Sequence, residues 1–92
     1  KRLNSFTDLY AYLSKNIPVV VSVRGPLSGA AREYKQGHLL VGVGWDAEKK
    51  LVLCHDPAFP TDEEVAHGYD IHEFVRAWER SHRLAYIAQP LL

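Results

Sequence analysis

Two side chains suited to proton transfer lie at the ends of neighbouring apolar runs in this chain. His38 begins the run HLLVGVGW, and Asp56 ends the run KLVLCHD. An imidazole gains and loses protons near neutral pH, and a carboxylate bonded to one ring nitrogen fixes which nitrogen carries the proton. His38 and Asp56 therefore have the residue types of a histidine–acid catalytic pair, provided that the fold brings them together.

The segment between the two runs predicts a β-hairpin. The polar residues DAEK carry the turn between a strand over residues 37–45 and a strand over residues 50–56. A turn centred on Ala47 places His38 directly opposite Asp56, with their Cβ atoms about 4.5–5.5 Å apart. The other same-face pairs of this register are Leu40 with Cys54, Gly42 with Val52, and Gly44 with Lys50. A slip of one residue would put the histidine and the aspartate on opposite faces.

The N-terminal part of the chain predicts a helix followed by a buried strand. Apolar side chains recur at helical spacing over residues 5–15, which indicates an amphipathic helix. Ser5 and Asp8 match a capping box at its start, and Pro18 stops it. The β-branched run IPVVVSVR (17–24) is typical of a buried strand.

The C-terminal part predicts a second helix and a last strand. Asp70 and Glu73 match another capping box, and RLAYIAQP (83–90) reads as a strand. The apolar face of the helix is formed by Ile71, Phe74, Val75 and Trp78. Residues 25–37 and 57–69 have no sustained period and are expected to be loops. This order of elements predicts an α+β fold, with a mainly antiparallel sheet and flanking helices.

Composition limits the classes of partner. The chain has 92 residues, enough for one core, and its eleven basic residues balance eleven acidic ones. This balance gives no electrostatic reason to expect binding to nucleic acid or to an anionic membrane. No apolar run approaches the roughly 20 residues that a membrane span needs. Because methionine is absent and the chain begins at Lys1, we expect it to be a piece of a longer protein.

Other residues with reactive side chains are poor candidates for catalysis or metal binding. Cys54 is the one cysteine, and its apolar neighbours predict burial, where a thiol is inert. Cys54, His55 and Asp56 are metal-ligand types, but strand alternation sends His55 to the opposite face. Ser28 lacks the glycine spacing of a nucleophile elbow and is expected to be a loop serine. No zinc-ligand spacing relates the remaining histidines, which are His67, His72 and His82.

The two hairpin segments resemble those of a known peptidase family. GHLLVGVGWD (37–46) and LVLCHDPA (51–58) are similar to the histidine and aspartate segments of papain-like cysteine peptidases, in particular the bacteriocin-processing (double-glycine leader) group. The strand PVVVSV before the histidine also fits, as does a helix with Tyr69, Phe74 and Trp78 after the aspartate. The resemblance covers about residues 5–90.

This resemblance implies that residues 1–92 are the C-terminal half of a papain-like cysteine peptidase domain. His38 would be the general base and acid, and Asp56 would orient it. The family's nucleophilic cysteine and oxyanion-stabilising glutamine would lie outside this chain, so the chain alone would be inactive. The resemblance further implies a peptide or protein substrate and no metal or organic cofactor.

The partners and the function follow from the same resemblance as expectations. A half-domain exposes part of a core face, so we expect pairing with the N-terminal half of the domain or self-association. A secreted or cell-envelope location fits the family, although the sequence itself leaves the location open. Two other functions remain alternatives: a degenerate module that binds a peptide without cleaving it, and a structural α+β domain. Acyl transfer is an alternative to hydrolysis, because related enzymes perform it.

Overall fold

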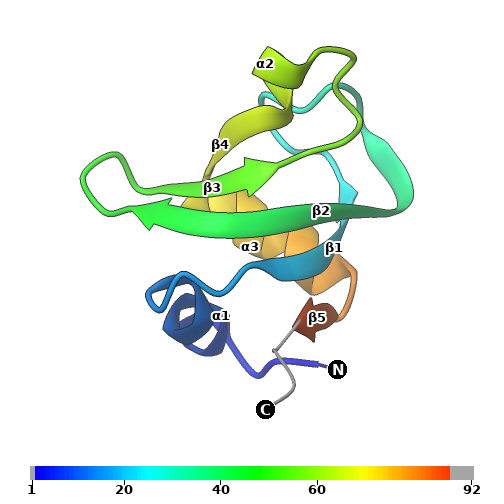
Figure 1. The fold of residues 1–92 in the computed structure, drawn as a ribbon. Helices are drawn as coiled ribbons and strands as arrows, with labels where there is room; N and C mark the ends of the chain where they lie inside the picture. The colour runs from blue at the N-terminus through cyan, green and yellow to red at the C-terminus, as the bar shows by residue number, and fades with distance from the viewer. Residues whose placement is uncertain (1, 88–92) are drawn as a thin grey trace.

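An antiparallel sheet forms the centre of the fold (Figure 1). The computed structural model describes residues 2–87, and its five strands lie in the order β4-β3-β2-β1-β5. The strands are β1 (Val19–Gly25), β2 (Tyr34–Asp46), β3 (Leu51–His55), β4 (Ala66–Asp70) and β5 (Ala85–Ile87). All neighbouring strands are antiparallel. The predicted α+β fold is therefore confirmed, and it is compatible with a papain-like half-domain.

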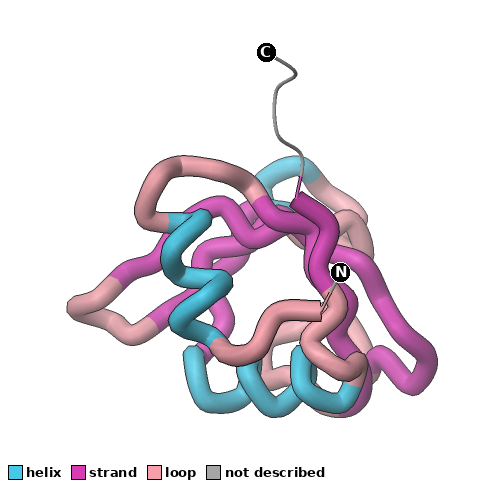
Figure 2. Tube along the Cα trace, turned by 90° about the horizontal axis from the view of Figure 1, so that it is seen from below, coloured by secondary structure: helices cyan, strands magenta, loops and turns pink. Residues whose placement is uncertain are grey.

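Two helices flank the sheet and share its hydrophobic core. They are α1 (Phe6–Leu13) and α3 (Ile71–Arg80), and the short helix α2 (Asp62–Val65) precedes β4. Figure 1 shows α3 behind the sheet, and Figure 2 shows the strands from below as a curved layer with α3 along one side. The core includes Leu9, Leu13, Val19, Val21, Leu40, Val52, Phe74 and Trp78. No helix in the described part of the chain is long and apolar enough to cross a membrane.

Of the two predicted helix N-caps, the structure forms the one at α3 and lacks the one at α1. The Asp70 carboxylate accepts hydrogen bonds from the backbone N–H groups of His72 and Glu73 and so caps α3, whereas the Glu73 carboxylate accepts from Ser28 and makes no bond back to Asp70 among the described residues. Ser5 is the N-cap of α1, but its side chain makes no capping bond. Asp8 reaches back one residue further than predicted, to the N–H of Asn4 at 3.0 Å. The capping box predicted for α1 is therefore wrong in its partners.

The predicted element boundaries need three corrections. Strand β2 begins at Tyr34, inside the segment that was expected to be a loop. The second expected loop, residues 57–69, contains α2 and most of β4. Tyr69 therefore lies in a strand and not in the helix to which the family pattern assigned it. The last strand covers Ala85–Ile87, and residues 88–90 of the predicted strand lie outside the described residues.

The hairpin between β2 and β3 forms, but its predicted register is wrong. Gly42 pairs with Cys54 and Gly44 pairs with Leu53, so Val43 is an extra residue on β2 and forms a bulge. The connection is also longer than expected, because Lys50 belongs to the turn and has a positive φ of 56°. A later turn centre and a bulge together replace the register that was predicted from a turn at Ala47.

Candidate active site

Asp56 is a fully buried carboxylate at the end of β3. Its side chain has 0% exposure, and its backbone N–H donates to the carbonyl of Val65 at 2.8 Å. This bond holds Asp56 next to the end of α2, where the chain enters β4. The position just beyond β3, an inner strand of the sheet, explains how a charged residue comes to lie inside so small a domain.

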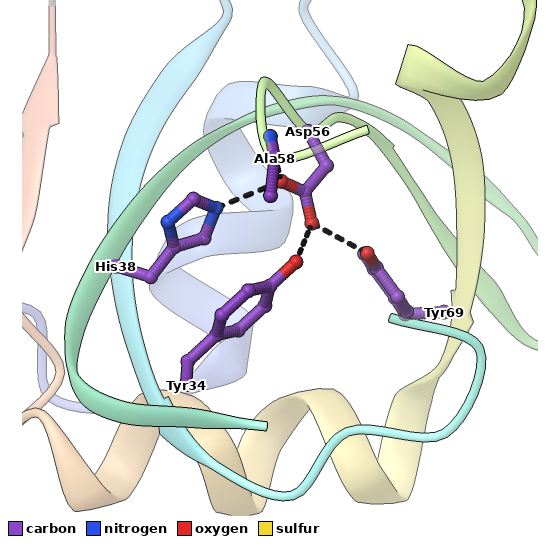
Figure 3. Close-up of polar contacts among 5 residues, drawn as sticks. All are labelled: Tyr34, His38, Asp56, Ala58 and Tyr69. Atoms are coloured by element: carbon purple, nitrogen blue, oxygen red, sulfur yellow. Dashed lines mark hydrogen bonds and ion pairs between the residues drawn. The ribbon is translucent and has the colours of Figure 1, made fainter. Parts of the chain in front are cut away.

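His38 bonds to this carboxylate from β2. Its Nε2 lies 2.7 Å from Oδ1 of Asp56, and the histidine side chain is 16% exposed (Figure 3). Continuing the pairs Val41–His55 and Gly42–Cys54 by one step puts Leu40 beside Asp56, with His38 as the next residue on the same face. The pair is therefore diagonal, a spacing that long side chains can bridge. The predicted contact exists although the predicted register does not.

The second ring nitrogen of His38 points away from Asp56 (Figure 3). In the described part of the chain this Nδ1 has no hydrogen-bond partner. With Nε2 committed to the carboxylate, Nδ1 is the nitrogen available to exchange a proton with another molecule or segment. Residues 32–38 line an open pocket of about 360 Å³ that includes His38.

Two tyrosines that the sequence analysis missed complete the coordination of the carboxylate. The hydroxyls of Tyr34 and Tyr69 both donate to Oδ2 of Asp56, each at 2.6 Å, and the N–H of Ala58 donates to Oδ1 at 3.0 Å (Figure 3). Tyr34 could have been found from its spacing, because positions 34 and 38 share one face of a strand. Tyr69 gave no such signal, because its strand was not predicted.

These contacts determine the charge state of the carboxylate. Burial alone would raise the pKa of Asp56, but hydrogen bonds from the two tyrosines, from Ala58 and from His38 outweigh burial and hold that pKa below its usual value. Burial and the nearby carboxylate raise the pKa of Tyr34 to about 12, and the same causes raise the pKa of Tyr69. At neutral pH the site therefore contains an ionised aspartate held by two neutral phenols.

Aromatic contacts hold the imidazole ring in place. The rings of Tyr34 and His38 are stacked, with centroids 4.0 Å apart and planes at 21°. The guanidinium of Arg32 lies 5.6 Å from the centroid of the Tyr34 ring. Tyr34 thus contacts both members of the pair, the carboxylate through its hydroxyl and the imidazole through its ring face.

Cys54 cannot act as a nucleophile in this arrangement. The residue is 1% exposed, and burial together with the charge of Asp56 raises the pKa of its thiol. Its Sγ lies 3.7 Å from the carbonyl oxygen of Val52, and no hydrogen bond joins it to His38 within the described residues. A neutral, buried thiol is a packing group.

The remaining candidates are separated from the site or have structural contacts. His55 is exposed, and Ser28 donates to Glu73 at 2.8 Å in a surface contact. His67 stacks on Phe59 with ring centroids 4.8 Å apart. Among the residues that the structure describes, no group of three or more histidine, cysteine, aspartate or glutamate side chains could hold a metal ion.

Comparisons with known proteins agree with the fold and with the resemblance seen in the sequence. Residues 1–86 match the model of the Peptidase_C39-like family. Neither the curated proteins nor the solved structures gave a significant match. The family match covers nearly the whole chain, and it confirms the relation to papain-like peptidases that the hairpin motifs indicated. The chain therefore belongs to the Peptidase_C39-like family.

Proposed function

We propose that this chain contributes the histidine and the acid of a cysteine peptidase centre that hydrolyses peptide bonds. The observation that carries the proposal is the bond between Nε2 of His38 and the buried Asp56, which leaves Nδ1 open. In this role His38 is the general base and acid, and Asp56 orients and stabilises the imidazole. The family match supports a peptidase-related role.

The nucleophile of this centre would come from a cysteine outside the 92 residues, because Cys54 is buried and protonated. Nδ1 of His38 would take the proton of that thiol, and the thiolate would attack the peptide carbonyl. The imidazolium would then return the proton to the departing amine, which leaves an acyl-enzyme. Water would hydrolyse this thioester, with His38 again accepting a proton.

Peptide cleavage by the natural polypeptide that carries this chain tests the proposal. We expect His38→Ala to lower kcat/KM by about 10²–10⁴-fold, the usual contribution of general acid–base catalysis. The matched control is His55→Ala, which removes an exposed histidine of the same hairpin. Cleavage that is unaffected by His38→Ala would contradict the proposal. Binding of a peptide without cleavage would instead support the non-catalytic peptide-binding alternative.

A further inference from the structure

We propose that Tyr34 and Tyr69 are positioning residues of this centre, which fix the orientation of Asp56 and take up part of its negative charge. Together the two residues are called the tyrosine clamp below. Through Asp56, the clamp would set which nitrogen of His38 carries the proton and how the ring is oriented. The contribution to catalysis rests on the proposed function, whereas the effect on His38 does not.

The hydrogen-bond geometry gives the clamp its orienting effect. Oδ2 of Asp56 accepts from both tyrosine hydroxyls, and Oδ1 accepts from Ala58 and His38. An ionised carboxylate has about four acceptor sites, and all four are used here. Rotation of the carboxylate would break several of these bonds at once. Oδ1 is therefore held toward Nε2 of His38, which favours the tautomer with the proton on Nε2 and the lone pair on Nδ1.

The two tyrosine hydroxyls have a more specific acceptor than burial alone requires. A buried tyrosine hydroxyl requires one hydrogen-bond partner, and any backbone carbonyl would serve. Instead, hydroxyls from β2 and β4 converge on the same oxygen of the same carboxylate at 2.6 Å (Figure 3). Distances this short are typical of bonds to a charged acceptor. Tyr34 adds a second constraint, because its ring is stacked on the imidazole.

The clamp also distributes charge. Each phenol that donates to Oδ2 stabilises the ionised carboxylate, which keeps Asp56 as the acceptor for Nε2–H of His38. The other charged groups near the ring are Arg32 beside Tyr34, and Glu33 and Lys35 in the pocket that includes His38. These three side chains are exposed and solvated, so their influence on the imidazole is weaker than that of the buried carboxylate.

Nitrogen-15 NMR of the His38 ring in the 92-residue chain, which distinguishes the two neutral tautomers, tests the clamp. The variants are Tyr34→Phe, which keeps the stacked ring, Tyr69→Phe, and the double variant. We expect the share of neutral His38 rings that carry the proton on Nδ1, read from the nitrogen-15 chemical shifts of the ring, to rise at least about threefold for each hydroxyl removed, because a carboxylate with fewer hydrogen bonds holds the Nε2–H group less firmly. Tyr86→Phe is the control, because Tyr86 is 52% exposed.

Two results would overturn the clamp. One is a folded double variant whose two His38 tautomers have the same populations as in the wild type, and the other is a smaller share of rings with the proton on Nδ1. If the double variant does not fold, the two single variants decide by the same criterion. The NMR measurement needs no cleavage, so it separates the two proposals. A natural polypeptide that fails to cleave peptides would contradict the peptidase function and leave the tautomer result intact.

Discussion

At the scale of single residues, the candidate site depends on Asp56. It is a fully buried charge in a small domain, and it is tolerated because His38, Ala58 and two tyrosines supply four hydrogen bonds. The carboxylate in turn accepts the hydrogen bonds of two phenols and an imidazole. Its loss would leave all three without an acceptor.

Replacing Asp56 by alanine should destabilise the fold strongly. We expect Asp56→Ala to lower the free energy of unfolding by about 3–5 kcal/mol, because removing the shared acceptor leaves two buried hydroxyls and an imidazole N–H unpaired, each at a cost of about 1–3 kcal/mol. Urea unfolding followed by circular dichroism measures this loss. Asp62→Ala, at an exposed aspartate, should change the same quantity by less than about 0.5 kcal/mol. Equal effects of the two substitutions would show that the network around Asp56 adds no stability.

The stability should also fall in acid for a reason specific to Asp56. Its folded-state pKa lies below the ordinary value of 3.8, so the unfolded chain binds the proton more readily. This stabilisation is fully present above the unfolded-state pKa and is lost as pH falls through the folded-state pKa. We expect the Tm to drop steeply below about pH 4, and the drop to be shallower in Asp56→Asn. If the Tm fell equally steeply with pH in the wild type and in Asp56→Asn, Asp56 would not be the cause of the acid sensitivity.

Alkaline pH should weaken the fold through the tyrosines. The folded-state pKa of Tyr34 is raised to about 12 and that of Tyr69 is also raised, so their contribution is present below the ordinary value of 10.0 and is lost as pH rises through the folded-state values. Thermal unfolding between pH 9 and pH 11 measures this loss of stability as the fall of the Tm with pH. Tyr34→Phe should flatten it, whereas Tyr86→Phe should leave it unchanged.

At the scale of elements, the sequence predicted the strands and helices that build the hairpin and its supports, but not their register. Alternation and turn residues located β2 and β3, because these signals are local. The bulge at Val43 and the turn that includes Lys50 depend on how the strand packs against its neighbours, and no local pattern indicated them. The His38–Asp56 contact was still predictable, because both residues lie on one face under either register.

The segment that carries Tyr69 was missed for a related reason. The sequence AHGYD is short and polar, and the edge strand β4 exists because it pairs with β3. Pairing of this kind is a tertiary effect that outweighs a weak local preference. Only one residue of the tyrosine clamp, Tyr34, could therefore have been predicted from the sequence. The histidine and the aspartate could be predicted from residue type and position.

The two helix starts make a matched pair for measuring capping. The carboxylate of Asp70 accepts from two backbone N–H groups of α3, whereas the side chain of Ser5 makes no capping bond to α1. We expect Asp70→Ala to lower the free energy of unfolding by about 0.5–2 kcal/mol, and Ser5→Ala by clearly less. Chemical unfolding of both variants checks this order. A larger loss for Ser5→Ala would contradict the capping geometry.

At the scale of the whole molecule, the site is a product of the complete sheet. Its side chains come from the start and middle of β2, the end of β3 and the edge strand β4, so no single element contains it. Cys54 lies in the same sheet, two residues before Asp56, and pairs with Gly42 on one side and His67 on the other. Exposing its thiol requires separating the strands that also hold the site together.

Thiol labelling of Cys54 should therefore report opening of the whole fold. With 1% exposure and a raised pKa, the thiol should react with a disulfide reagent at least about 10³-fold more slowly in the native chain than in the urea-unfolded chain. The labelling rate should rise with urea in step with the unfolded population. Thr7→Cys in a Cys54→Ala background places a thiol at an exposed position of α1 and should label rapidly. Rapid labelling of native Cys54 would show that the sheet opens locally without unfolding of the whole chain.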